Sequence, residues 1–143
     1  MTYLILISHG NFAEGLRDSL GMFVGEPIDN VIALGLKTNE STSAFSKRIE
    51  ELSQKIPKDS RVIILGDIIG GSPLTIACNV LNNNESRKNC IILGGMNLPM
   101  ALTAFLIQNT QDIVSLKKTI ISEACNSLKE LKINLNDSNE QDI

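Results

Sequence analysis

The sequence is poor in aromatic residues and in histidine. Its 143 residues include no tryptophan, one tyrosine and a single histidine, His9. A core must therefore be packed mainly from aliphatic side chains, which make up most of the 43% hydrophobic content. A single histidine also excludes a metal site built only from histidines.

The three cysteines form no pattern typical of a metal site or a disulfide framework. Cys78, Cys90 and Cys125 are odd in number, lie scattered among apolar residues and include no Cys-x-x-Cys pair. Cysteines in such surroundings behave as small hydrophobic side chains. We therefore expect reduced, buried thiols, as in a cytoplasmic protein, and neither a metal nor another cofactor.

Other absences bear on membranes and nucleic acids. The apolar runs are about as long as a strand and fall well short of the roughly 20 residues of a membrane span. The N-terminus lacks the positively charged segment of a signal peptide. The formal net charge is −3, and no basic run or basic-aromatic patch is present, which argues against a nucleic-acid partner. A chain of this length is typical of one domain, which we expect in the cytoplasm.

Apolar segments of two different periods alternate along the chain. Short β-branched runs predict strands, and longer segments with apolar residues three or four apart predict helices. We expect strands at residues 3–7, 31–34, 61–65 and 90–93. We expect helices at residues 12–24, from a cap at Ser41 or Thr42 up to Pro57, and at 74–81, 99–107 and 112–131. The first helix should bury one face, formed by Phe12, Leu16, Leu20 and Phe23.

This alternation predicts a single-domain α/β fold, with a mostly parallel open sheet and helices on both faces. About four strands are parallel, and residues 133–135 are a candidate antiparallel edge strand. Residues 1–135 would form the domain, and the polar residues 136–143 a mobile tail. Right-handed crossovers bring the carboxyl ends of the parallel strands to one edge of the sheet, where ligands bind in such folds.

His9 is expected at that edge, directly after the first strand and before Gly10. Asn11 and Glu14 have the spacing of an N-cap and its capping-box partner, which would open the first helix. Imidazole serves as a nucleophile, a base or a metal ligand near neutral pH. A carboxylate at the end of the third strand, Asp67, would bond one imidazole nitrogen and leave the other free to attack. We therefore predict that His9 is the nucleophile and that Asp67 orients it.

A glycine-rich turn follows Asp67. Gly70 and Gly71 let backbone N–H groups approach a ligand closely, and a helix N-terminus favours negative charge. Ser72 is a good N-cap that also carries a hydroxyl, and Pro73 is a good first helical residue. Together these residues predict a binding turn for phosphoryl oxygens. The sequence contains no Walker lysine and no evident Mg²⁺ carboxylate cluster, which argues against a nucleotide as the phosphoryl donor.

Several of these residues also have structural interpretations, which stay open at this point. Asp67 could cap a turn, and the paired glycines could serve only the turn itself. Asn97, after the fourth strand, could support the site together with Gly10 or merely cap the next helix. Arg17 and Lys37 are interpreted as solvated surface charges without a role.

Three segments resemble the motifs of the mannose-class enzyme IIA of the bacterial sugar phosphotransferase system. They are HGNFAEGL at 9–16, DIIGGSP at 67–73 and MNLPM at 96–100. They occur in the family's order over about residues 1–130. Their joint occurrence is specific, whereas Gly-Gly-Ser alone would be weak. Ile69 stands where an aromatic residue is common and Thr75 where asparagine often follows Ser-Pro, departures that bear on partner fit.

The resemblance implies a phosphohistidine carrier. His9 would take a phosphoryl group from the phosphocarrier protein HPr and pass it to enzyme IIB. Enzyme IIB would then phosphorylate sugar entering through the membrane components IIC and IID. The resemblance also implies a homodimer whose antiparallel edge strand can come from the partner subunit. A peripheral position at the membrane transporter is left open, and IIB is expected as a separate protein.

Two other functions remain open. The phosphotransfer subunit of dihydroxyacetone kinase shares the fold and an active histidine, although the Gly-Gly-Ser-Pro segment favours the sugar-transport class. A regulatory domain of the same fold would use the same edge to sense phosphate or a partner. Transfer to a dihydroxyacetone kinase partner, compared with transfer to a IIB, separates the first two functions.

Overall fold

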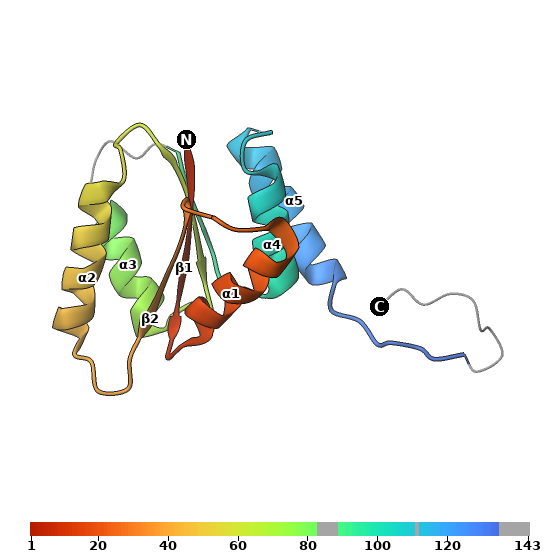
Figure 1. Ribbon diagram of the computed structural model, residues 1–143, viewed down its shortest axis with the longest axis horizontal. Coiled ribbons are helices and arrows are strands. Elements are labelled where there is room, and N and C mark those ends of the chain that lie inside the picture. The colour runs from red at the N-terminus through yellow and green to blue at the C-terminus, as the bar shows by residue number, and fades with distance from the viewer. Residues whose placement is uncertain (83–88, 111, 135–143) are drawn as a thin grey trace.

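The computed structural model describes residues 1–82, 89–110 and 112–134, in which strands and helices alternate (Figure 1). The elements are β1 (Thr2–His9), α1 (Phe12–Val24), β2 (Val31–Leu36), α2 (Thr42–Lys55), β3 (Arg61–Gly66), α3 (Ser72–Asn82), β4 (Cys90–Leu93), α4 (Leu98–Ile107) and α5 (Ile113–Asn126). No helix in these parts of the chain is both long enough and apolar enough to cross a membrane.

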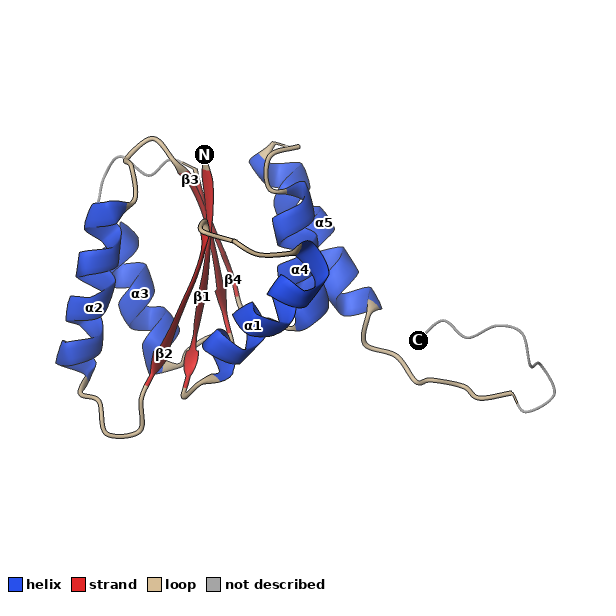
Figure 2. Ribbon diagram, in the orientation of Figure 1, coloured by secondary structure: helices blue, strands red, loops and turns tan. Residues whose placement is uncertain are grey.

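The four strands form one parallel sheet in the order β2-β1-β3-β4. The helices α2 and α3 cover one face, and α1, α4 and α5 cover the other (Figure 2). The predicted α/β fold with a parallel sheet between two layers of helices is thus confirmed. A fifth strand at 133–135 is not present among the described residues, because 133 and 134 lie outside the sheet and 135 is not described.

Alternating side chains of β1 pack into two separate cores, one on each face of the sheet. Leu4 and Leu6 pack in the cluster with α1, α4 and α5, whereas Ile5 and Ile7 pack in the cluster with α2 and α3. All four side chains are fully buried, as expected for a central parallel strand covered on both faces. The strand therefore ends at a position that is fixed from both sides, and His9 is its last residue.

The first helix has the predicted bounds but buries a different face. Leu16 and Leu20 are buried as predicted, whereas Phe12 and Phe23 are exposed. Ala13 faces the core in their place, because its small side chain allows α1 to lie close to the sheet. In α2 the cap at Ser41 is confirmed, as is the buried stripe of Phe45, Ile49 and Leu52.

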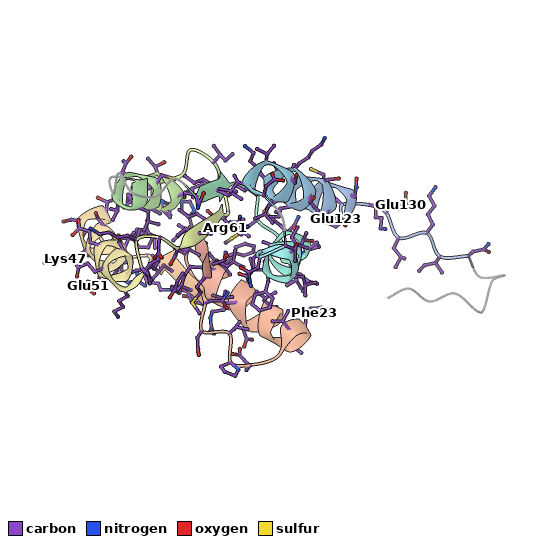
Figure 3. The ribbon with its side chains drawn as sticks, turned by 90° about the horizontal axis from the view of Figure 1, so that it is seen from above. Phe23, Lys47, Glu51, Arg61, Glu123 and Glu130 are labelled. Atoms are coloured by element: carbon purple, nitrogen blue, oxygen red, sulfur yellow. The ribbon has the colours of Figure 1, made fainter. Side chains whose placement is uncertain are left out.

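The last helix is shorter than predicted. It ends at Asn126, and the hydroxyl of Ser127 donates to the Ala124 carbonyl at 2.6 Å, closing the last turn. Leu128 is 89% exposed, so packing does not extend the helix further. The chain from there runs away from the body, as Glu130 in Figure 3 illustrates. The predicted mobile tail at 136–143 lies outside the described residues.

The expectation of buried cysteines is only partly met. Cys78 and Cys90 are half-buried, but Cys125 is exposed. It lies one residue beyond Ala124, the last member of the buried stripe of α5 that includes Leu116 and Ile120. Neighbouring helical positions are about 100° apart, so Cys125 is turned away from the sheet.

Candidate functional site

The alternation of β1 separates two adjacent polar residues at its end. Ser8 is fully buried on the α1 side, and its hydroxyl accepts the Ala13 backbone N–H at 2.8 Å. His9 therefore points to the opposite side, where α3 begins. The predicted capping box is wrong, because Asn11 makes no side-chain cap and Glu14 accepts the Gly35 N–H at 2.9 Å instead. Ser8, a buried residue of β1, accepts the N–H at the start of α1 in place of the Asn11 side chain.

His9 and Asp67 form a pair across neighbouring strands. The Asp67 backbone N–H donates to the Ile7 carbonyl at 3.1 Å, which places the carboxylate directly beside His9. Asp67 Oδ2 lies 2.8 Å from His9 Nδ1 and also accepts the His9 backbone N–H at 2.9 Å. A carboxylate at Nδ1 favours the tautomer with its proton there. The lone pair of Nε2 is then free to act as a nucleophile.

The surroundings keep Asp67 ionised. Partial burial alone would raise the pKa of this carboxyl, but hydrogen bonds from the His9 backbone, the His9 ring and the Ile68 N–H outweigh that effect. The net result is a pKa below the ordinary value of 3.8. Asp67 therefore offers a full negative charge to the imidazole throughout the neutral range.

The pair is open to a large reactant. The His9 side chain is 50% exposed, while that of Asp67 is only 16% exposed. The orienting group is thus shielded, whereas the ring that would react can be reached from solvent. This arrangement suits transfer between proteins better than reaction inside a closed pocket, because no lid has to open.

The glycine-rich turn lies against the imidazole. A Cβ atom at Gly71 would stand 2.9 Å from His9 Cε1 and 3.6 Å from Nε2, so only glycine allows the backbone this close. Gly70 has a φ of +86°, a left-handed conformation that side chains disfavour. The turn thus brings the start of α3, with its partial positive charge, next to Nε2.

Ser72 is the first residue of α3 rather than its N-cap. The Gly71 carbonyl accepts both the Thr75 backbone N–H at 3.2 Å and the Thr75 hydroxyl at 3.0 Å. Gly71 therefore occupies the capping position, and α3 begins two residues earlier than predicted. The Ser72 hydroxyl is not needed for the cap and stays a candidate phosphate contact.

Gly10 shapes the other side of the site. It has a φ of +55°, and its N–H donates to the Leu36 carbonyl at 2.8 Å. A Cβ atom at Gly35 would collide with the Gly10 carbonyl oxygen, so β2 and the turn after His9 approach closely. Lys37 bonds to this turn and is not the solvated charge predicted for it. Its place directly after β2, at the same sheet edge, was the signal for this role.

Arg17 is also engaged rather than solvated. Its guanidinium donates to the backbone carbonyls of Val31 at 2.8 Å and Ile28 at 3.3 Å. Asn97 accepts the Met100 N–H at 2.8 Å and caps α4. This bond satisfies the structural interpretation of Asn97, and its supporting role at the site stays a prediction.

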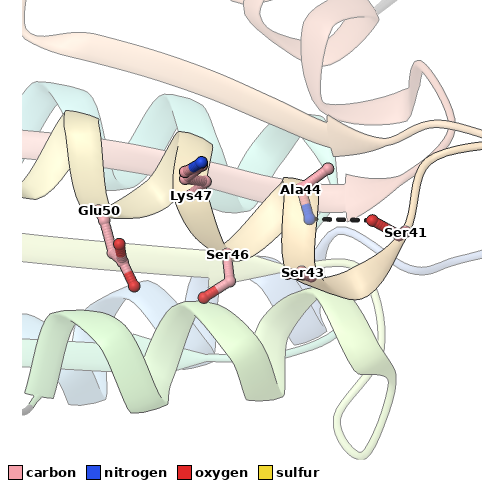
Figure 4. A pocket seen from close by; sticks show the side chains of 6 residues that line it. All are labelled: Ser41, Ser43, Ala44, Ser46, Lys47 and Glu50. Atoms are coloured by element: carbon pink, nitrogen blue, oxygen red, sulfur yellow. Dashed lines mark hydrogen bonds between the residues drawn. The ribbon is translucent and has the colours of Figure 1, made fainter.

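A pocket lies on α2 and contains none of the predicted site residues. It has a volume of about 500 Å³ and is lined by Ser41, Ser43, Ala44, Ser46, Lys47 and Glu50 (Figure 4). The Ser41 hydroxyl there is already occupied by the Ala44 N–H at 3.0 Å. Within the described residues, no cluster of His, Cys, Asp and Glu side chains could hold a metal ion.

The contact between Gly71 and His9 gives a first prediction. For the phosphorylation of His9 that the family resemblance implies, a Gly71→Ala variant should be about 10-fold to 100-fold slower, because the new methyl group pushes the imidazole out of line. The rate is measured in a single turnover with excess phosphoryl donor. Gly15→Ala places the same methyl group in open space on α1 and controls, by thermal unfolding, for the effect of a Gly→Ala change on stability. An unchanged rate in Gly71→Ala would contradict the close approach.

Comparison with known proteins assigns the chain to a family. The model of the family described as "PTS system fructose IIA component", where PTS is the phosphotransferase system, matches residues 3–121. The chain belongs to this family of mannose-class EIIA components. The fructose-specific EIIA component of Bacillus subtilis (strain 168) is 27% identical over 132 residues, which are 92% of this chain and 82% of that relative.

Solved EIIA structures have the same fold. A PTS IIA protein associated with the fucose utilization operon of Streptococcus pneumoniae has a TM-score of 0.77 at 30% identity, over 90% of this chain and 92% of that chain. The mannose/sorbose specific IIA subunit from Enterococcus faecalis has a TM-score of 0.79 at 20% identity, over 93% and 96%. EIIA membership confirms a phosphotransfer role in a sugar phosphotransferase system. The sugars in the three names differ, so no sugar follows for this chain.

Proposed function

We propose that the chain carries a phosphoryl group on His9 between HPr and enzyme IIB. The observation that carries the proposal is the 2.8 Å contact between Asp67 Oδ2 and His9 Nδ1, which leaves Nε2 free beside the start of α3. Membership in the EIIA family supports the direction of transfer, from a general phosphocarrier toward a sugar-specific acceptor. IIB would in turn serve IIC and IID in the membrane.

The transfer needs no further reactant. The Nε2 lone pair attacks the phosphorus atom carried by HPr, and an N–P bond forms on His9. The bond from phosphorus to HPr breaks, and its electron pair returns to HPr. The positive charge that develops on the imidazole is balanced by the Asp67 carboxylate. No metal or cofactor enters this step, and passage to IIB repeats it with His9 as the leaving group.

The start of α3 is suited to the phosphoryl oxygens. Backbone N–H groups at a helix N-terminus have no partner within the helix and carry partial positive charge. Pro73 has no N–H to offer, so the donors are the amides around it and the Ser72 hydroxyl. Gly71 brings the backbone close to the ring, and the positive φ of Gly70 allows the turn before it. These residues are our candidate phosphate contacts, with Gly10 and Asn97 in support.

The test is transfer in both directions. Purified chain incubated with phosphorylated HPr should gain an acid-labile phosphate on His9 and lose it when IIB is added. A dihydroxyacetone kinase partner in place of IIB should leave the label on the chain. Failure of HPr to label the chain would refute the proposal, and efficient transfer to the kinase partner would favour the alternative. Since both partners act in the cytoplasm, we propose the same location for the chain.

A homodimer forms the second part of the proposal. The strand β4 lies at the edge of the sheet, next to an apolar pocket of about 440 Å³ lined in part by Ile92, Ile121 and Leu128. The C-terminal segment at 128–134 runs away from the body and exposes Leu131 and Ile133, which have the two-residue spacing of one strand face (Figure 1). The segment of a second copy would pair with the β4 edge and cover the pocket.

The dimer proposal predicts a change in mass on truncation. A chain that ends at Ser127 should sediment as a monomer at concentrations where the full chain is a dimer, because the pairing segment is missing. A chain that ends after residue 135 keeps the segment and should remain a dimer. Sedimentation equilibrium measures both. A dimer that survives the shorter truncation would show that subunits associate through another surface.

A further inference from the structure

A polar cluster behind His9 joins three segments that are distant in sequence. Lys37 Nζ lies 2.7 Å from Asn11 Oδ1, 2.9 Å from Glu14 Oε1 and 3.4 Å from the Gly10 carbonyl. Asn11 and Gly10 form the turn that follows the reactive histidine, and Glu14 is in the first turn of α1. One ammonium group therefore holds both ends of the connection from β1 to α1.

We propose that Lys37 is a positioning residue for His9, which acts by fixing the turn at Gly10 and Asn11 through its contacts with both residues and with Glu14 at the start of α1. The inference rests on the proposed function only in that His9 is taken as the reacting group. Lys37 touches neither the imidazole nor Asp67 among the contacts that the described residues make. Its action is therefore indirect, because it positions the backbone that carries the His9 side chain.

Lys37 is itself held in place. Its backbone N–H donates to Glu40 Oε1 at 3.1 Å, and the Glu40 carboxylate also accepts both bonds from Arg48 Nη1, at 2.8 and 3.0 Å. Arg48 Nη1 further contacts the Gly35 carbonyl at 3.2 Å. Because this chain of bonds ends on α2, the backbone of Lys37, from which its side chain extends to the turn, is anchored to a packed helix.

The Glu14 carboxylate attracts the Lys37 ammonium electrostatically. Its Oε1 accepts from both Lys37 and the Gly35 N–H, whereas its Oε2 is buried without a hydrogen-bond partner among the described residues. Burial would raise the pKa of Glu14, but the bonds from Lys37 and from backbone N–H groups outweigh it and lower the pKa. Without Lys37 this carboxylate would lose its neutralising charge, and the Gly10 carbonyl would lose the ammonium that it shares with Glu14. The turn would then be pushed away from β2.

Small shifts of that turn matter because the ring is enclosed on two sides. Asp67 Oδ2 lies 2.8 Å from one ring nitrogen, and a Cβ atom at Gly71 would lie only 2.9 Å from Cε1, so the backbone there is close to the ring. Gly10 is the residue next to His9, so a displaced Gly10 carbonyl rotates the histidine relative to both neighbours. The position of Nε2 thus depends indirectly on Lys37, through the Gly10 backbone.

The decisive experiment compares Lys37→Met with Lys55→Met. Methionine keeps the aliphatic stem and removes the charge, and Lys55 is an exposed lysine in the last turn of α2, far along the helix from this cluster. In single-turnover labelling by phosphorylated HPr, Lys37→Met should lower the saturating rate by about threefold to tenfold. The HPr concentration for half-saturation should stay unchanged. Lys55→Met should match the parent chain in both, and Lys37→Arg should restore most of the rate.

A second measurement does not depend on transfer. Since His9 is the only histidine, its imidazole gives one set of NMR signals in the unphosphorylated chain. Lys37→Met should shift or broaden that set, while Lys55→Met leaves it in place. Ring signals and rate that both stay unchanged would overturn the inference, as would a change in half-saturation alone, which would assign Lys37 to HPr docking. If HPr fails to label even the parent chain, the proposed function fails, and the ring signals alone decide the positioning role.

Discussion

The His9→Gln variant is expected to take no acid-labile phosphate from phosphorylated HPr. Glutamine keeps a polar side chain of similar reach but has no ring nitrogen with a free lone pair. Labelling should therefore fall from one phosphate per chain to background. Because the chain has no second histidine, no other imidazole can take over the reaction. The measurement is incorporation of labelled phosphate, followed by mass mapping of the modified peptide.

The fold should survive this change. The His9 side chain is half exposed, and among the described residues its imidazole makes a hydrogen bond with Asp67 alone. Circular dichroism and thermal unfolding of the variant should match the parent chain closely. Brief acid treatment of the labelled parent chain should release the phosphate and so identify a phosphohistidine. Acid-stable label, or label that persists in His9→Gln, would place the phosphate on a different residue and refute the carrier proposal.

The sheet could be predicted because its strands leave little ambiguity. The run from Arg61 to Leu65 is continuous and β-branched, as a strand covered on both faces requires. The same argument placed the run before His9, and parallel crossovers then brought His9 and Asp67 to one edge. The 2.8 Å contact also requires β1 and β3 to be neighbours in the sheet, and this order is visible only in the structure.

The helix ends were harder because they depend on competition between neighbours. Ser8 belongs to a strand, yet its hydroxyl caps α1 and displaces Asn11 from that role. Such a bond requires the strand and the helix to be in place first, so the spacing of Asn11 and Glu14 alone was misleading. Lys37 was missed for the same reason, since its three partners lie more than 20 residues away in the sequence.

The C-terminal region shows a different limit. The apolar spacing of α5 continues in the sequence to Leu128. A helix is stabilised mainly where its apolar side chains pack against a core. Among the described residues of this single chain, none after Ala124 belongs to a buried core, and the helix ends at Asn126. The apolar residues that follow are explained if a second copy covers them. A sequence pattern cannot distinguish burial within one chain from burial between two.

The Asp67→Asn variant is expected to lose about 10²-fold to 10⁴-fold in the rate of phosphorylation, with an upper limit of about the 10⁴-fold loss that the same replacement causes in a Ser-His-Asp triad. The Asp67 carboxylate accepts from both the His9 backbone N–H and the ring. An amide group presents either a neutral oxygen or an NH₂ to Nδ1. In the second case Nδ1 must accept the bond, the ring proton moves to Nε2, and the nucleophilic lone pair is lost.

Asp112→Asn is the matched control. Its carboxylate also accepts a backbone N–H, from Ser115 at 2.9 Å, and the bonds from Ser115 likewise lower its pKa. The position caps α5 and has no contact with His9 among the described residues. Labelling by HPr should stay within twofold of the parent rate if the loss in Asp67→Asn comes from the imidazole rather than from a missing carboxylate in general. The NMR signals of His9 should report the changed tautomer only in Asp67→Asn.

Acid stability gives this variant a second, independent outcome. The folded-state pKa of Asp67 lies below its ordinary value of 3.8, so its stabilising contribution is complete above that value and is lost as the pH falls through the folded-state pKa. Asp67→Asn removes this contribution, and the thermal midpoint of the variant should fall less steeply below pH ~4. A variant with the predicted acid response and normal labelling would show that Asp67 stabilises the fold without orienting His9. A slow variant whose His9 tautomer is unchanged would mean that the charge, and not the tautomer, is what the transfer requires.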